Sequence, residues 1–467
     1  MTKLATSPYL SVQDTTRALR SGELSSEALV ESQLARIARL DPQLHAFVEV
    51  YTHEARRTAH ALDELRRSGV DLGPLHGVTV AIKDLFHIKG HYLQAGSVAR
   101  PAQLSEITAT VVDRLRAAGA IIIGKTHTVE FAFGGWGTNA TMGTPWNPWD
   151  MKLHRVPGGS SSGSAVAVAA GLSCAALGTD TGGSVRIPAG LCGLVGLKTT
   201  HGLVSRHGLM ELCPTHDTVG PITRTVADAA LLLDAIAGPD PQDPASAAAP
   251  MRRVLPHLDK DVRGLRVWVL PRTEREGVEP EVLALYDRAL RKLVELGMQP
   301  VERALPQSLA DSMRIAGQLM SAEGYANLGE LFEQNLKFDP HVRRRILLGR
   351  DIGAAKYIAL LKERDQARRD MLAALENIDV LFLPTNAISA IPVSAVDELA
   401  TPLSRFGRFA NLLDLCSVAV PAGLSPQGLP VSVQFVGGPL QEPLIMRAAQ
   451  AYERGTPWHT AVPPGLK

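Results

Sequence analysis

Two loops rich in glycine and serine hold residues whose types and spacing could support nucleophilic chemistry. The first loop, PGGSSSG, covers residues 157–163, and the second, TGGS, covers residues 181–184. Glycines in front of a serine let the backbone turn so that consecutive N–H groups point at one spot, which is what an oxyanion hole requires. A tight turn explains either loop taken alone, so the choice depends on the elements around them.

Those elements place both loops at one edge of a sheet. A helix is expected near residues 162–171 and a short buried strand, CAALG, at residues 174–178. A loop that enters a helix and a loop that leaves the next strand lie at the same, carboxyl edge of a parallel sheet. We therefore expect the two loops to face each other where α/β proteins form their sites.

A base for these serines stands at the end of another predicted strand. The run GVTVAIKD, residues 77–84, is short and apolar, and its lysine is Lys83. Most lysines at a strand end reach toward water. A lysine in an apolar pocket instead loses affinity for its proton through desolvation, and can then act as a base. Lys83 is the candidate base.

Two other motif matches indicate different chemistry but fit their surroundings poorly. GAIIIGKT, residues 119–126, matches the phosphate-loop pattern, yet its middle residues are typical of a strand rather than of a loop around phosphates. Gly159, Ser161 and Gly163 match the G-x-S-x-G nucleophile elbow, which needs a buried strand in front of it and a histidine partner. A proline-containing loop precedes Ser161, and none of the 14 histidines stands out.

Composition indicates the class of protein. Hydrophobic residues make up 45% of the 467 residues, so a large core can form. The net charge of +1 gives no electrostatic reason to expect a nucleic acid or an anionic membrane as partner. The four cysteines are dispersed, residues 1–20 lack the apolar stretch of a signal peptide, and no apolar run would span a bilayer. We expect a cytoplasmic protein.

Alternating helix and strand patterns predict an α/β fold. We expect a large mixed, mostly parallel β-sheet covered by helices on both faces. One domain over residues 1–467 is favoured over two separable ones. Its parts are a helical segment at about 10–70, a catalytic core at about 71–238, a proline-rich seam at about 239–262, and a second half at 263–467.

The long block at residues 157–198 resembles the amidase signature family, and the resemblance extends from about residue 10 to residue 460. The family implies a Ser-cisSer-Lys triad without metal or cofactor. By position, Ser184 matches the nucleophile, Ser160 the cis-serine and Lys83 the base. The oxyanion hole would be formed by the N–H groups of Thr181, Gly182, Gly183 and Ser184.

The resemblance also implies how the site works. Lys83 would draw a proton through Ser160 while Ser184 attacks an amide carbonyl, and water would then resolve the acyl-enzyme. Asp180 and Arg186 flank the nucleophile and are expected to orient its loop. The sequence departs from the family at Ser162, Thr79 and Thr199, which are not triad positions.

Substrate and partners are less clearly indicated. We expect a free-standing amidase for a small carboxylic amide, such as an alkyl or aryl amide, an anilide or a carbamate, and leave room for a homodimer. One alternative is the A subunit of a tRNA-dependent amidotransferase, a glutaminase whose usual Tyr-Asp-Gly segment is not found here. Another is an allophanate-type hydrolase, because residues 409–423 are similar to a stretch of those enzymes.

Candidate pocket residues come from the segment between the lysine and the first serine loop. The sequence EFAFGGWGTNATMG, residues 130–143, is rich in aromatic and small residues. If Trp136 lines the pocket, the acyl group is expected to be apolar or aromatic, whereas core packing is the plainer interpretation. The candidates are Phe133, Gly134, Trp136 and Met142.

Overall fold

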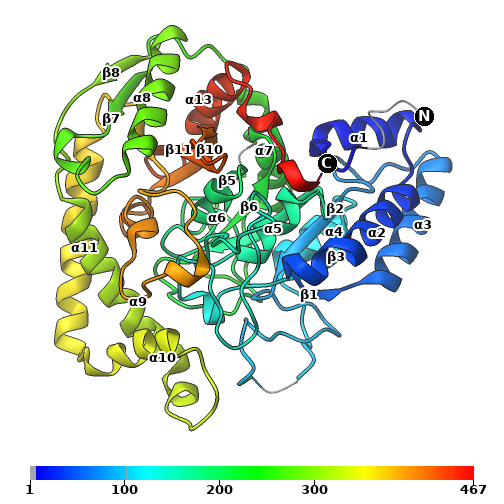
Figure 1. Ribbon diagram of the computed structural model, residues 1–467, viewed down its shortest axis with the longest axis horizontal. Helices are drawn as coiled ribbons and strands as arrows, with labels where there is room; N and C mark the ends of the chain where they lie inside the picture. The colour runs from blue at the N-terminus through cyan, green and yellow to red at the C-terminus, as the bar shows by residue number, and fades with distance from the viewer. Residues whose placement is uncertain (1–6, 101–102, 252, 467) are drawn as a thin grey trace.

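The described residues form one mixed, 11-stranded β-sheet with helices packed around it (Figure 1). The structure is a computed structural model that describes residues 7–100, 103–251 and 253–466. The strands lie side by side in the order β1 (Phe47–Val50), β3 (Ile121–Thr126), β2 (Thr79–Lys83), β4 (Ala175–Asp180), β6 (Thr218–Thr223), β5 (Val195–Lys198), β10 (Cys416–Leu424), β11 (Pro430–Gly437), β9 (Val380–Pro384), β7 (Arg266–Val269) and β8 (Gln299–Val301).

Antiparallel pairings outnumber parallel ones in this sheet. Parallel pairing is confined to β2 with β3 and β4, and to β7 with β8 and β9. Strands β6, β5, β10 and β11 pair antiparallel with their neighbours in the middle of the sheet. The expected mixed α/β fold is confirmed, but the expectation of mostly parallel pairing is wrong. A tight hairpin joins β10 to β11, and such a short connection permits only antiparallel pairing.

Helices cover both faces because side chains alternate along the strands. In β2, Val80 and Ile82 lie in one hydrophobic cluster, and Ala81 lies in the other. The first face is covered by α1 (Val12–Ser21), α4 (Thr110–Ala117), α7 (Val226–Ile236), α8 (Pro280–Glu295) and α13 (Glu442–Arg454). The second face is covered by α2 (Ser26–Leu44), α3 (Thr52–Arg67), α5 (Ser162–Ala169) and α6 (Arg186–Leu191).

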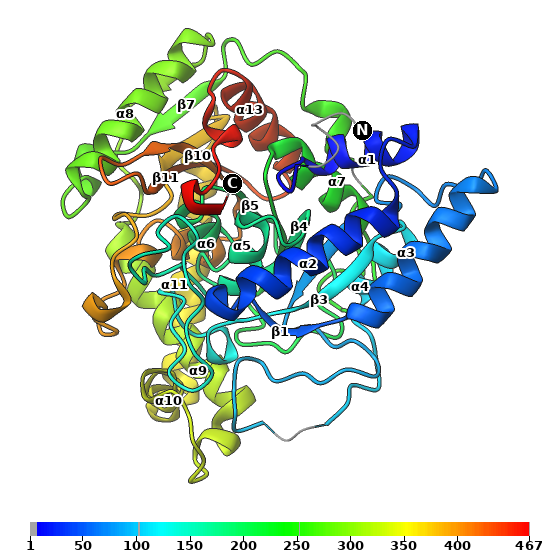
Figure 2. The same ribbon diagram turned by 45° about the vertical axis from the view of Figure 1, so that its right-hand side comes forward.

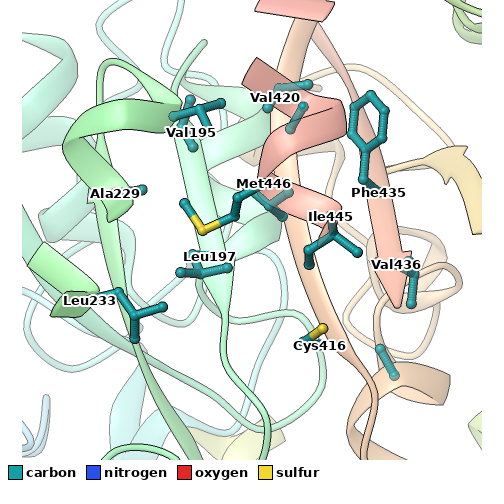
Figure 3. Close-up of a cluster of buried hydrophobic side chains, with 14 of the residues drawn as sticks. Val195, Leu197, Ala229, Leu233, Cys416, Val420, Phe435, Val436, Ile445 and Met446 are labelled. Carbon is teal, nitrogen blue, oxygen red and sulfur yellow. The ribbon is translucent and has the colours of Figure 1, made fainter. Parts of the chain in front are cut away.

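The two layers are visible in the figures. Helices α2 and α3 pack against each other, and α3 lies on β3 (Figures 1 and 2). On the opposite face, Ile445 and Met446 of α13 lie among Val195 and Leu197 of β5 and Val420 of β10 (Figure 3). This packing buries the sheet on both faces, including β4, which leads into the second Gly/Ser loop.

A group of longer helices lies beside the sheet. It includes α9 (Leu309–Phe332), α10 (Pro340–Leu347), α11 (Ala354–Ala374) and the short α12 (Arg408–Leu412). Helix α9 packs against the other three. The helices among the described residues are too short or too polar to span a bilayer. All four cysteines are buried free thiols.

Most of the predicted elements near the site are present. The run at 77–84 forms β2, and GAIIIGKT forms β3, in which Lys125 pairs with Asp84 at 3.1 Å instead of binding phosphate. The N-terminal segment is not wholly helical as expected, because residues 47–50 form β1 at the sheet edge. A strand of only four residues is too short for its alternation of apolar and polar side chains to be recognised between two amphipathic helices. Strands that precede residues 239–262 in the chain and strands that follow them belong to the same sheet. The single-domain organisation stays a prediction.

Candidate active site

Lys83 is the last residue of β2 and is completely buried. Its strand lies between β3 and β4. Because side chains alternate along a strand, Lys83 points to the same face as Ala81, which is the face that α5 covers. The residues just before α5 are those of the first Gly/Ser loop. The fold therefore brings the lysine to the first loop, as the sequence predicted.

The amino group of Lys83 contacts two hydroxyls. Its Nζ donates to Oγ of Ser160 at 2.8 Å and to Oγ1 of Thr179 at 2.7 Å. Burial lowers the pKa of Lys83 from 10.5 to about 7, although the charges of Asp217 and Asp180 act to raise it. Much of Lys83 is therefore uncharged at neutral pH and able to accept a proton. Thr179 was not predicted, since its position depends on the pairing of β2 with β4.

Ser160 is held in place by its own backbone. The peptide bond between Gly159 and Ser160 is cis, as the family resemblance implied. The carbonyl of Ser160 accepts hydrogen bonds from the N–H of Val129 at 3.1 Å and from Oγ1 of Thr128 at 2.9 Å. The N–H of Gly159 donates to the carbonyl of Gly135 at 2.8 Å. These bonds fix the loop with the Ser160 hydroxyl at Lys83.

Ser184 lies in the second loop, directly after β4. Its exposed fraction is 7%, whereas Ser160 and Ser161 are fully covered. The N–H of Ser161 donates to the carbonyl of Ser184 at 3.1 Å, so the two loops meet as predicted. The hydroxyl of Ser161 is bound to the backbone of Thr179 at 3.3 Å. Among the described residues, no hydrogen bond joins the hydroxyls of Ser160 and Ser184.

The backbone N–H groups of the second loop are not equivalent. The N–H of Gly183 donates to Oδ1 of Asp180 at 2.7 Å. In this conformation Gly183 is therefore engaged, which corrects the expectation that it is a free oxyanion donor. The N–H groups of Gly182 and Ser184 have no acceptor among the described residues. These two groups, and the N–H of Thr181, which likewise has no acceptor among the described residues, are available to a substrate oxygen.

Asp180 and Arg186 fix the loop around Ser184. The guanidinium of Arg186 contacts both carboxylate oxygens of Asp180 at 3.0 Å. Burial alone would raise the pKa of Asp180, but Arg186 holds it well below its usual range. Arg186 also donates to Gln434 at 3.0 Å and to Asn411 at 2.9 Å, which lie 248 and 225 residues away in the chain. Sequence reasoning missed both residues because nothing local marks them.

We expect Arg186→Met to destabilise the protein strongly. The variant leaves the Asp180 carboxylate buried without its counter-charge, which costs about 3–5 kcal/mol. Urea denaturation at pH 7 measures the free energy of unfolding. The double variant Arg186→Met/Asp180→Asn should recover part of the loss, because it removes the uncompensated charge. A single variant as stable as the wild type would contradict the structural role.

A second buried polar cluster lies behind the loop. Oγ1 of Thr181 donates to Oδ1 of Asp217 at 2.5 Å, and burial raises the pKa of Asp217 to about 6. Beyond it, one potential metal-ligand atom from each of Cys213, His216 and Glu323 lies within 4.8 Å of the other two. The Glu323 carboxylate accepts hydrogen bonds from the Cys213 thiol and from two hydroxyls. We interpret this group, which the sequence did not single out, as a hydrogen-bonded cluster of the core.

One of the four pocket candidates, Phe133, lines a cavity. The cavity has a volume of about 440 Å³ and is formed mainly by α9, α10 and the 398–408 segment. A Cβ on Gly134 would lie 3.3 Å from Nη1 of Arg345, another lining residue. Trp136 is only 4% exposed and donates through Nε1 to the carbonyl of Ala400 at 3.0 Å. Gly134, Trp136 and Met142 are not among the lining residues of this cavity, and their pocket role stays a prediction.

We expect Trp136→Ala to act on stability rather than on substrate choice. Its side chain packs in a cluster with Val156, Ile187 and Leu191, and truncating a buried tryptophan costs about 3–5 kcal/mol. The check is the unfolding free energy together with the ratio of kcat/KM for an aliphatic and an aromatic amide. Phe133→Ala should instead change that ratio. A changed ratio in Trp136→Ala with unchanged stability would support the pocket role instead.

Known proteins match the chain over nearly its whole length. The family model named Amidase matches residues 28–446. The A subunit of the glutamyl-tRNA(Gln) amidotransferase of Chloroflexus aggregans is 40% identical, over 97% of this chain and 98% of the relative. Two solved structures are also similar. One is described as a vestigial protein complex that reveals the origins of an s-triazine catabolic enzyme, with a TM-score of 0.89, 31% identity and 95% and 98% coverage of the two chains. The other is the peptide amidase of Stenotrophomonas maltophilia, with a TM-score of 0.82, 34% identity and 95% and 96% coverage.

The fold and these matches define an enzyme that hydrolyses C–N bonds. The chain belongs to the amidase family, which confirms the resemblance found in the sequence.

Proposed function

We propose that the protein hydrolyses a carboxylic amide through Ser184, with Ser160 and Lys83 as its proton relay. The observation that carries this proposal is the 2.8 Å contact between Lys83 and Ser160, together with the lysine pKa of about 7. A buried lysine of this kind serves as a base near neutral pH. The hydroxyl of Ser184, unlike that of Ser161, has no backbone partner among the described residues.

The proposed steps begin at the contact between Lys83 and Ser160. Neutral Lys83 accepts the proton of Ser160, Ser160 takes the proton of Ser184, and Oγ of Ser184 bonds to the amide carbon. The N–H groups of Gly182 and Ser184 hold the oxyanion, and losing such a donor costs about 10²–10³ in rate. The relay returns the proton to the leaving nitrogen as the C–N bond breaks. Water then attacks the ester, and the acid leaves as Ser184 regains its proton.

Two candidates remain for the amide substrate. The first is a small amide hydrolysed by the chain alone, which is the reaction type of the similar peptide amidase. The second is glutamine, with the chain as the A subunit of a tRNA-dependent amidotransferase. The 40% identity to such a protein over 97% of the chain favours the second candidate. The lack of the usual Tyr-Asp-Gly segment favours the first.

Ammonia release by the purified chain distinguishes these candidates. The panel contains glutamine, short alkyl amides, phenylacetamide and carbamates, each measured beside Ser184→Ala. Ser184-dependent turnover of an alkyl or aryl amide supports a free-standing amidase. Turnover of glutamine alone, or only after partner subunits are added, supports the amidotransferase role. Turnover that survives Ser184→Ala would contradict both.

A further inference from the structure

Arg408, at the start of α12, is a cation without an acidic partner. Its side chain is half-buried, and its one hydrogen bond among the described residues is a 3.5 Å contact from Nη1 to the carbonyl of Met313. Burial, and then the charge of Arg345, lowers the pKa of Arg408 to about 10, so it stays charged at neutral pH. A buried charge of this kind is costly unless something compensates for it.

Arg408 lines the same cavity of about 440 Å³ as Phe133. The lining holds three other arginines: Arg345 pairs with Glu398 at 2.7 Å, Arg314 pairs with Glu363 at 3.0 Å, and Arg344 is exposed to solvent. Because Glu398 is neutralised in this way, the positive charge of Arg408 is not offset within the cavity. A volume of this size is within the range of small-molecule sites, roughly 300–1,000 Å³.

The cavity adjoins both Gly/Ser loops. A Cβ on Gly182, two residues before Ser184, would lie 3.0 Å from Cγ of Arg408. On the other side, the segment that carries Phe133 is bonded to the first loop through Gly135 and Gly159. Arg408 therefore lies against the loop that carries Ser184.

We propose that this cavity binds a carboxylate group of the substrate, with Arg408 as the residue that determines specificity. The inference rests on the proposed function and narrows the substrate to an amide that bears a free carboxylate at its other end. The guanidinium of arginine has the planar, two-donor geometry that matches a carboxylate. The carboxylate supplies the charge that Arg408 lacks, and the amide end extends to the Ser184 loop.

Binding to Ser184→Ala tests the proposal without turnover. The probes are monoamides of straight-chain dicarboxylic acids, such as adipamic acid, and the alkyl amides of equal length, such as hexanamide, measured by calorimetry. We expect the acid to bind about 10- to 100-fold more tightly than the neutral amide. Equal affinities for every chain length would overturn the proposal.

The arginine itself is tested by Arg408→Gln in the Ser184→Ala background. The preference for the acid should disappear while hexanamide binds as before. Arg369→Gln is the matched control, because Arg369 is exposed on α11 and donates only to Gln366. Equal weakening of both probes would show a structural role and overturn the proposal. If Arg408→Gln does not fold, Arg408→Lys is used instead. This variant keeps the positive charge but lacks the two parallel donors of the guanidinium, so it should bind the acid at intermediate strength.

The proposed function and this inference can be contradicted separately. Wild-type protein that binds adipamic acid selectively but releases no ammonia from any amide would contradict the amidase reaction alone. Wild-type protein that hydrolyses hexanamide as well as adipamic acid would contradict the carboxylate site alone.

Discussion

Replacing Ser184 by alanine is expected to lower kcat/KM for the best amide substrate by about 10⁵–10⁶-fold, because the variant has no hydroxyl to form the acyl-enzyme. Binding of the substrate should persist, since the N–H groups of Gly182 and Ser184 belong to the backbone. Steady-state ammonia release measures the loss, and calorimetry measures the remaining affinity.

Ser161→Ala is the matched control, since it removes a hydroxyl from the G-x-S-x-G match in the other loop. The Ser161 side chain bonds only to the backbone of Thr179, so we expect a loss of at most about tenfold. If Ser161→Ala instead abolishes turnover and Ser184→Ala does not, the nucleophile elbow is the correct interpretation. Mass spectrometry of wild-type protein quenched with an ester substrate should place the acyl group on Ser184.

The two loops and the lysine were predictable because each one is marked locally, whereas the family resemblance selected Ser160 among three consecutive serines. Lys83 ends an apolar strand, and the two serines follow glycines in loops that frame one helix and one strand. The helix and strand pattern then requires the loops to meet at one edge of the sheet. The contact between Ser161 and Ser184 shows that this reasoning was sound.

The surroundings of these residues were less predictable, because they come from distant parts of the chain. Asn411 and Gln434 bind Arg186, and Arg408 packs over Gly182, yet all three belong to the last quarter of the sequence. Their placement depends on the antiparallel pairing of β5 with β10, which the strand and helix rhythm does not reveal. The same limit explains Trp136. Its type suggested a pocket, but a distant segment bonds its indole and covers it.

Lys83→Ala is expected to lower kcat/KM by about 10²–10⁴-fold, the usual contribution of a general base. The pH profile gives the more specific result. Lys83 must be neutral to accept a proton, so wild-type kcat/KM should rise with pH and level off above the lysine pKa of about 7. This rise of kcat/KM below pH 7 is the acid limb of the profile. The variant should lose the acid limb together with the activity. Lys83→Arg is the charge-preserving comparison and should also be inactive, because arginine stays protonated.

Asp217→Asn distinguishes the titration of Lys83 from that of Asp217, the other buried group with a pKa in the same range. The charge of Asp217 raises the pKa of Lys83, so its removal should lower that pKa and move the acid limb to lower pH. If protonation of Asp217, whose own pKa is about 6, caused the limb, the limb would vanish in Asp217→Asn. A profile that shifts downward but keeps its shape therefore assigns the titration to Lys83, and a profile that becomes flat assigns it to Asp217.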